Sequence, residues 1–172
     1  GLPANMVAQL QLSAPILLTE THDTSDFSCG EASLDHWLRR RAISNQLGGA
    51  SRTYVVCIGA RVVAFYALAT SVIVATEATG RFRRNMPNPI PVVVLARLAI
   101  DLKHQGQGLG RALFQDAAQR IISASEIIGI RGLIVHAITE SAKAFYLQLG
   151  MECSPIEPML LMATLSDLRA AC

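Results

Sequence analysis

The residues best suited to chemistry form a glycine-rich segment, Gln105-Gly106-Gln107-Gly108-Leu109-Gly110-Arg111, between an apolar run and a helical pattern. Glycines let the backbone approach a ligand closely, and free N–H groups at a helix start attract phosphate or pyrophosphate. The segment lacks the Gly-Lys-Ser/Thr ending of a P-loop, and its GxGxG spacing differs from the GxGxxG of a Rossmann turn. We therefore expect a phosphate-binding turn; the alternative is a glycine turn that only caps the helix.

The elements around this segment predict an α/β fold. The apolar run 91–101 reads as a buried strand, and Gly108–Ser125 carries apolar residues at helical spacing. Further strands are expected at 14–20, 53–58, 61–74, 132–138 and 159–163, and further helices at 34–47 and 141–149. The order β-α-β-β-β-α-β-α-β predicts a mixed sheet. Between the strands 61–74 and 91–101, an arginine-rich segment and three prolines are expected to interrupt regular structure.

Length and composition limit the function classes. The 172 residues match one ordinary domain, and 51% hydrophobic with 16% charged residues exclude a disordered chain. Residues 6–172 contain no repeat or linker and are expected to form a single domain, whereas we interpret 1–5 as a cloning remnant. The four cysteines lack metal-ligand spacing, and no apolar run is long enough to span a membrane. We expect a cytoplasmic protein that binds neither a metal nor a membrane.

The net charge of +2 conceals an uneven distribution. Residues 36–111 hold eleven basic and two acidic side chains, a net +9, whereas the rest holds four basic and eleven acidic ones, a net −7. Thirteen of the fifteen basic residues are Arg, whose planar fork suits phosphate. The pattern favours an anionic ligand and predicts two oppositely charged surfaces, with a genomic bias toward Arg as the alternative explanation.

Two motifs resemble the GNAT N-acetyltransferase superfamily. The strand Leu98–Asp101, followed by Gln105-x-x-Gly108-x-Gly110 and a helix, is similar to its acyl-CoA motif. Residues 142–151 resemble its last conserved segment, a short helix with a Tyr that ends at a Gly and an apolar residue. The resemblance implies a GNAT fold, in which a central mixed, splayed sheet is flanked by helices, and acetyl-CoA as the co-substrate.

The resemblance also implies roles for individual residues. Main-chain groups of the strand would hold the pantetheine arm, and the amides of the glycine-rich segment would hold the pyrophosphate. The cofactor-binding residues expected are Leu98, Ala99, Ile100, Gln105, Gly106, Gln107, Gly108, Leu109, Gly110, Arg111 and Lys143. Tyr146 is the candidate catalytic acid, because a phenol with a reference pKa of about 10 stays protonated at neutral pH and can donate to a thiolate. The alternative is a Tyr that only packs beside Phe145.

A narrower resemblance covers nearly the whole chain. Phe27–Gly30, Leu34–Leu38, Gly49–Val55 and Arg97–Asp101 are similar to segments of the GNAT toxins of bacterial toxin–antitoxin pairs. This resemblance implies acetylation of the α-amino group of aminoacyl-tRNA, inhibition of translation, a ribbon-helix-helix antitoxin as partner, and a homodimer.

Arginines supply the expected tRNA contacts. These are Arg39, Arg40, Arg81, Arg83 and Arg84. The segment 81–84 is preferred because no apolar periodicity places it in a core. An aromatic content of 5% favours recognition of the RNA backbone over base stacking. The alternative function is a GNAT enzyme that acetylates a protein amine (Lys or an N-terminus) or a small-molecule amine.

Overall fold

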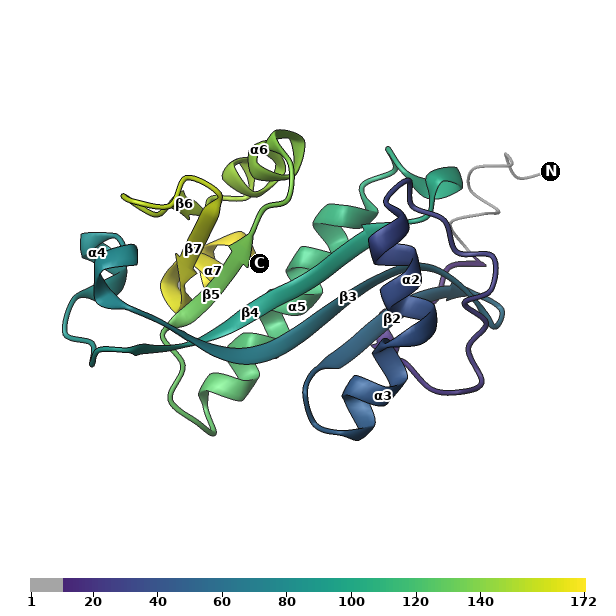
Figure 1. Ribbon diagram of the computed structural model, residues 1–172, viewed down its shortest axis with the longest axis horizontal. Coiled ribbons are helices and arrows are strands. Elements are labelled where there is room, and N and C mark those ends of the chain that lie inside the picture. Colours follow the sequence, from purple (N-terminus) through teal and green to yellow (C-terminus); the bar gives the residue numbers. More distant parts are fainter. Residues whose placement is uncertain (1–10) are drawn as a thin grey trace. The chain divides into compact units, whose positions relative to one another are not determined.

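The computed structural model describes residues 11–172 (Figure 1), so the expected cloning remnant, 1–5, lies outside the described range. The strands are β1 (Ile16–Leu17), β2 (Arg52–Ile58), β3 (Arg61–Ile73), β4 (Ile90–Ile100), β5 (Gly132–His136), β6 (Glu152–Cys153) and β7 (Leu160–Thr164). The α-helices are α2 (Ala32–Arg40), α3 (Ala42–Leu47), α4 (Gly80–Arg83), α5 (Leu109–Ser125), α6 (Glu140–Gln148) and α7 (Leu165–Ala171). Short 3₁₀ turns, η1 and η2, cover Ala75–Glu77 and Leu102–His104.

The strands form one seven-stranded sheet in the order β1-β2-β3-β4-β5-β7-β6. Strands β4 and β5 pair in parallel at Val93–Leu133 and Val94–Ile134, whereas β1–β2, β5–β7 and β6–β7 pair antiparallel. The predicted mixed sheet with flanking helices is therefore confirmed. The splay of its central strands stays a prediction.

The described chain forms two compact units. The first contains the chain up to Ala67 together with Arg97–Leu113, and the second contains Leu68–Ala96 together with Phe114–Cys172. Strands β3 and β4 and helix α5 each contribute residues to both units.

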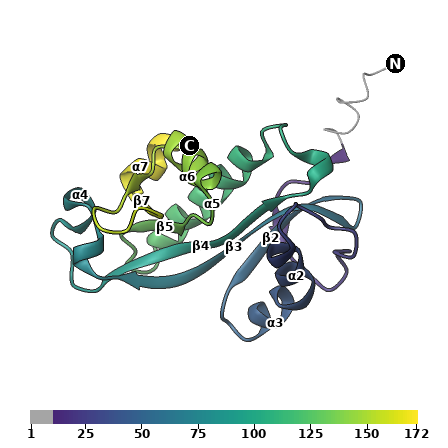
Figure 2. The ribbon, with the colours of Figure 1, turned by 45° about the horizontal axis from the view of Figure 1, so that its top comes forward.

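The core of the first unit forms around aromatic side chains. The Trp37 ring of α2 stacks on Phe65 of β3 with centroids 6.0 Å apart, and Phe27 meets the same ring edge-on at 5.4 Å. Such pairs add specific geometry to the burial of large apolar area. Figure 2 shows α2 and α3 beside β2, where Leu38 and Ala42 join this core.

The predicted single helix 34–47 is wrong, because two helices meet at Arg41, whose φ is −121°. Helix α3 is fixed separately by the side chain of Gln46. Its Nε2 donates to the carbonyl of Leu18 at 2.8 Å, and its Oε1 accepts from the N–H of Thr53 at 2.9 Å. Apolar periodicity continued across Arg41, so the sequence pattern alone did not reveal the break.

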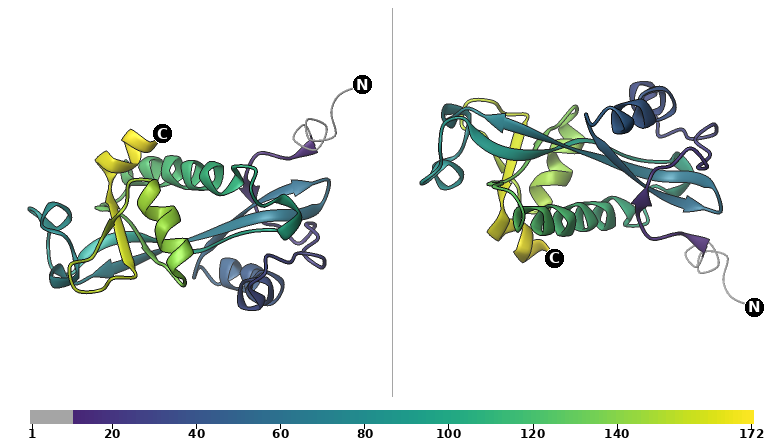
Figure 3. Two further views of the ribbon diagram at one scale, coloured as in Figure 1. Left: turned by 90° about the horizontal axis from the view of Figure 1, so that it is seen from above. Right: turned by 90° about the horizontal axis from the view of Figure 1, so that it is seen from below.

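The second unit is organised around β7, which contacts β5, β6, α4, α6 and α7. Its core includes Phe82 of α4, Ile90 and Val92 of β4, and Leu160 and Met162 of β7. Figure 3 shows α7 beside α5, where Gln115 Nε2 donates to the Ala171 carbonyl at 3.5 Å.

Three local expectations for the second unit need correction. The segment 81–84, expected to be irregular, begins inside the helical turn α4, because the Thr79 side chain accepts from the N–H of Phe82 and caps it. The strand expected at 91–101 is confirmed as β4, but Pro91 does not interrupt regular structure, because a proline is tolerated near the start of a strand. Strand β6 and helix α7 were not expected, and α7 begins with a capping box formed by Thr164 and Asp167.

Within residues 11–172, no helix combines the length and the hydrophobicity needed to cross a membrane.

We predict that Gly132→Ala lowers the free energy of unfolding by about 3 kcal/mol. A Cβ at this position would lie 2.0 Å from the carbonyl oxygen of Ala163, so β5 and β7 would have to separate. Gly80→Ala is the matched control: a Cβ there meets nothing within 4 Å, and Ala lowers the entropy of the unfolded chain. Denaturant unfolding of both variants checks this, and equal stabilities would contradict the proposed steric conflict.

Candidate functional site

The end of β4 presents backbone groups at one edge. The N–H of Asp101 donates to the Val63 carbonyl of β3 at 2.8 Å. The backbone groups of successive residues along a strand point to opposite edges, so those of Ala99, two residues before Asp101, also face β3. Those of Leu98 and Ile100 therefore face the other edge, the position that a pantetheine arm paired with β4 requires.

One carboxamide connects this strand to the glycine-rich segment. Gln105 Nε2 donates to the Ile100 carbonyl at 2.9 Å and to the Cys29 carbonyl at 3.0 Å. The side-chain Nε2 of the expected cofactor residue Gln105 thus binds the protein and is not available to a ligand. The Ile100 carbonyl already accepts one hydrogen bond, which leaves the Leu98 backbone groups and the Ile100 N–H as the candidate pantetheine partners.

The loop between β4 and α5 is further fixed to the segment before α2. The Asp101 carboxylate accepts from the N–H of Ser28 at 3.1 Å and from the N–H of Lys103 at 3.0 Å. The N–H of Leu102 donates to the Ser28 carbonyl at 2.9 Å. Hydrogen bonds to charged acceptors are the stronger ones, so this connection is well defined although the residues are exposed.

Cys29 is structural at this position. Its N–H donates to the Asp35 carboxylate at 2.9 Å, and its thiol lies 3.6 Å from the Glu31 carbonyl. Burial, together with the hydrogen bond to Asp35, raises the pKa of the Cys29 thiol to about 11. The thiol is protonated at neutral pH and is a poor nucleophile.

The glycine-rich segment has the backbone conformation that its composition predicts. Gly106 and Gly108 have φ of +78° and +82°, values that residues with a Cβ rarely adopt. A Cβ placed on either would meet nothing within 4 Å, so the backbone faces open space. Helix α5 starts at Leu109, and the first N–H groups of a helix have no intrahelical acceptor. The residues Gly106, Gln107, Gly108, Leu109 and Gly110 therefore fit a pyrophosphate held by main-chain amides, with Arg111 exposed beside them.

The candidate acid Tyr146 lies on α6 in the second unit. Its buried ring contacts Phe145 edge-on at 5.0 Å and Phe114 at 6.3 Å. Burial raises the pKa of the Tyr146 phenol above its ordinary value, so the group remains a proton donor throughout the neutral range. Lys143 lies one turn earlier on α6, and Thr139 caps the helix by accepting from the N–H of Ala142.

The expected tRNA arginines differ in their surroundings. Arg40 of α2 is exposed, as are Arg83 and Arg84 at the end of α4. Arg39, also exposed, donates through Nη1 to the Phe27 carbonyl at 2.7 Å, so part of its guanidinium serves the fold of the first unit.

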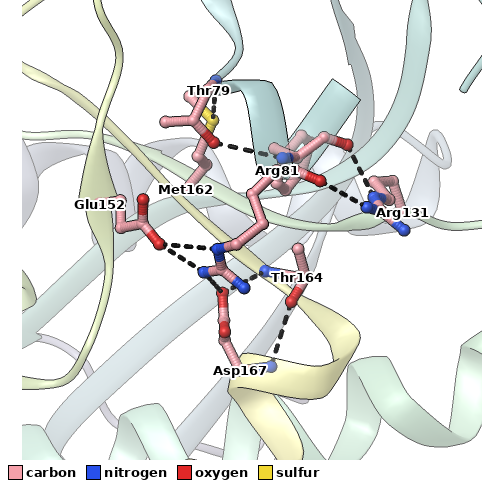
Figure 4. Close-up of polar contacts among 8 residues, drawn as sticks. Thr79, Arg81, Arg131, Glu152, Met162, Thr164 and Asp167 are labelled. Atoms are coloured by element: carbon pink, nitrogen blue, oxygen red, sulfur yellow. Dashed lines mark hydrogen bonds and ion pairs between the residues drawn. The ribbon is translucent and has the colours of Figure 1, made fainter. Parts of the chain in front are cut away.

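Arg81 is engaged with two carboxylates. Its guanidinium binds Glu152 of β6 and lies 2.8 Å from Oδ2 of Asp167 in α7, as Figure 4 shows. Burial favours a higher pKa for the Asp167 carboxyl, but hydrogen bonds from Arg81 and Thr164 outweigh it and lower the pKa. Acids from the negative part of the sequence therefore neutralise a cation from the positive part. The expectation of two separate, oppositely charged surfaces is wrong at this position.

Among residues 11–172 there is no group of three or more His, Cys, Asp or Glu that could hold a metal ion.

A profile described as "Acetyltransferase (GNAT) domain" matches residues 49–152, a segment that includes parts of both units. The chain belongs to the GNAT acetyltransferase family. The tRNA-acetylating toxin of Mycobacterium tuberculosis is 48% identical over 158 residues, which cover 92% of this chain and 95% of that protein.

Solved structures of GNAT toxins are also similar to this GNAT protein. A Tyr-to-Phe mutant of KacT has a TM-score of 0.87 and 29% identity, with 94% of this chain and 99% of that chain covered. AtaT complexed with acetyl-methionyl-tRNAfMet has a TM-score of 0.85 and 30% identity, with coverage of 92% and 98%. A mutant AtaT bound to acetyl-CoA and to the C-terminus of the antitoxin AtaR has a TM-score of 0.79 and 31% identity, with coverage of 93% and 97%.

Sequence reasoning missed the residues that hold the GNAT glycine segment in place. Asp101 was noted only as the end of a motif, and Ser28 and Cys29 only as part of another, yet their hydrogen bonds join the two motifs. Ser28 and Asp101 are 73 residues apart in the sequence, and no local sequence pattern indicates a contact over that separation.

We predict that Gln105→Ala and Gln105→Glu both weaken acetyl-CoA binding roughly 10-fold, the cost of losing hydrogen bonds to two carbonyls. The Glu variant has nearly the same shape, but a carboxylate cannot donate to the Ile100 and Cys29 carbonyls. Gln119→Ala, an exposed Gln on the same GNAT helix, should leave affinity unchanged. Calorimetric titration with acetyl-CoA measures the effect, and normal affinity in the Glu variant would refute the positioning role of Gln105.

Proposed function

We propose that this GNAT protein transfers the acetyl group of acetyl-CoA to the α-amino group of aminoacyl-tRNA and thereby blocks translation. The observation that carries the proposal is the 48% identity to a tRNA-acetylating toxin over nearly the full length of both chains. The similarity to AtaT in complex with acetyl-methionyl-tRNAfMet supports the same substrate class.

The residues of the first unit fit acetyl-CoA. The open space at Gly106 and Gly108 gives a pyrophosphate access to the main-chain amides, and Arg111 adds positive charge beside it. The Leu98 backbone groups and the Ile100 N–H would pair with the pantetheine amides, which orients the thioester. Gln105 positions the end of β4 and the glycine-rich segment relative to each other, since its side chain binds the Ile100 carbonyl at the end of β4.

The chemical step requires little from side chains. A neutral α-amine attacks the thioester carbonyl, the C–N bond forms and the C–S bond breaks. The nitrogen releases one proton to water, and the departing thiolate takes a proton from a donor. We assign the donation of that proton to Tyr146, whose buried phenol is protonated at every pH at which the amine is neutral and translation operates. Lys143, one turn away on the same helix, is proposed to contact the cofactor.

On the substrate side, Arg39, Arg40, Arg83 and Arg84 are proposed to contact the phosphate backbone of the tRNA, because phosphate contacts supply affinity and orientation. The two carboxylates on Arg81 favour a structural role for that residue instead.

We also propose a ribbon-helix-helix antitoxin, a homodimer and a cytoplasmic location. The antitoxin is supported by the AtaT structure that contains the C-terminus of AtaR. The dimer is what the resemblance to GNAT toxins implies. The cytoplasm is the compartment of the proposed substrate.

Incubation with labelled acetyl-CoA should transfer the label to aminoacyl-tRNA and not to the same tRNA after deacylation, because only the aminoacyl ester carries the free amine. Protein and polyamine acceptors are tested in parallel. Label on these acceptors, with none on aminoacyl-tRNA, would replace the proposal with a protein or small-molecule acetyltransferase.

Tyr146→Phe should lower kcat about 100-fold, the lower range for removal of a general acid, while the affinity for acetyl-CoA is retained. Because burial raises the pKa of this phenol, its ionisation should cause no loss of wild-type kcat below about pH 10. Steady-state kinetics from pH 6 to 10 tests both statements. An unchanged kcat in the Phe variant would assign the proton to another donor, and Phe145→Leu controls for altered packing around Tyr146.

A further inference from the structure

A cavity of about 630 Å³ in the second unit is lined by four arginines from three segments of the chain. Arg81 belongs to α4, Arg84 follows that helix, Arg131 precedes β5, and Arg169 belongs to α7. No carboxylate lines the cavity. Arg131 and Arg169 lie outside the basic segment 36–111, in the part of the chain with a net charge of −7, so their proximity to Arg81 and Arg84 is a product of the fold.

The four arginines serve two different purposes. Arg81 is neutralised by Glu152 and Asp167, and these contacts tie α4 to β6 and α7 (Figure 4). Among residues 11–172, no carboxylate forms an ion pair with Arg84, Arg131 or Arg169. The cavity therefore presents three uncompensated positive charges, on walls that Arg81 holds together.

Arg131 is held in place before any ligand arrives. Its Nε donates to the Phe82 carbonyl and its Nη2 to the Arg81 carbonyl, both at 2.7 Å. Its guanidinium also lies over the Phe82 ring, 5.9 Å from the centroid. A side chain fixed in this way loses little conformational entropy when it binds a ligand.

We propose that this arginine-lined cavity binds phosphate groups of the RNA backbone, as a docking site for the tRNA substrate. The proposal rests on the function proposed above and adds Arg131 and Arg169 to the substrate-binding residues. The guanidinium forks of Arg84 and Arg169 can bind phosphate oxygens in a bidentate manner, whereas Arg131, whose Nε and Nη2 bind carbonyls, adds its positive charge. Three cations around one cavity suit a chain of phosphates better than a single anion.

The lining favours RNA backbone over other anions. The cavity is in the size range of sites for drug-sized ligands, larger than one phosphate needs. Its apolar lining residues, such as Met86, Ile130 and Leu165, are half-buried, whereas Arg84 and Arg169 are exposed. No aromatic side chain lines the cavity, so base stacking is not expected and binding should be independent of RNA sequence.

The test uses Arg84→Gln and Arg169→Gln, each of which removes one exposed guanidinium. Each variant should raise the KM for aminoacyl-tRNA about 10-fold, while kcat and the KM for acetyl-CoA stay near wild type. Affinity for deacylated tRNA should fall equally, and the slope of its logarithm against the logarithm of salt concentration should decrease by about 0.7–0.9 per lost contact. Arg52→Gln, an exposed Arg on β2, is the charge-matched control and should change none of these values.

Binding of deacylated tRNA needs no acetyl transfer, so it separates the failure of this inference from the failure of the proposed function. Wild-type binding and an unchanged salt slope in both variants would overturn the docking site even if aminoacyl-tRNA is acetylated. An equal rise in the KM for acetyl-CoA would assign the cavity to the cofactor instead. Loss of affinity for the antitoxin, with tRNA binding intact, would make it a protein-docking site. Arg131→Gln is interpreted only if its unfolding transition matches wild type, because Arg131 also holds α4.

Discussion

The geometry of the candidate cofactor site depends on one side chain, Gln105. Its amide binds the last carbonyl of β4 and the Cys29 carbonyl, so the strand end, the turn and the segment before α2 are fixed together. Without it, the glycines that follow would be free to adopt many conformations, because glycine has the widest range of accessible backbone angles. A site that binds pyrophosphate through main-chain amides needs glycine, because only glycine readily adopts the required backbone angles, and it also needs that glycine to be held in one conformation. The hydrogen bonds of Gln105 and Asp101 supply that constraint from outside the glycine segment.

In the second unit, the short helix α4 is also fixed by contacts from other elements, and here these contacts involve charged side chains. Helix α4 has only one turn, and a helix this short is not stable by itself. Thr79 caps its start, Arg131 binds its carbonyls at Phe82 and Arg81, and the Arg81 side chain reaches Glu152 and Asp167. Exposed ion pairs contribute little stability singly, but here two carboxylates share one guanidinium and fix its direction. The result is a defined wall for the neighbouring cavity.

Much of the fold could be predicted from the sequence, because it depends on local patterns. The run before Asp101, the glycine spacing and the apolar face of α5 each lie within about twenty residues, and together they indicated strand, turn and helix correctly. The break at Arg41 could not be predicted, since the contacts of Gln46 with Leu18 and Thr53 that fix α3 come from other elements. The same holds within the candidate site. The sequence predicted the glycine-rich turn before α5, but the residues that position this turn, Ser28 and Asp101, are joined only by folding.

The distribution of charged residues along the sequence was a poor predictor of where uncompensated positive charge lies on the surface. A segment with a net +9 indicated anion binding, yet one of its preferred arginines, Arg81, is neutralised by Glu152 and Asp167 from outside that segment. Two arginines from the nominally acidic remainder, Arg131 and Arg169, instead line a cavity that contains no acid. The effective charge of a surface depends on which carboxylates lie within a few ångströms, because salt screens exposed charges beyond about 10 Å. Arg81 illustrates the consequence. Its positive charge is compensated by Glu152 and Asp167, and these ion pairs fix the walls of the cavity on which Arg84 and Arg169 remain uncompensated.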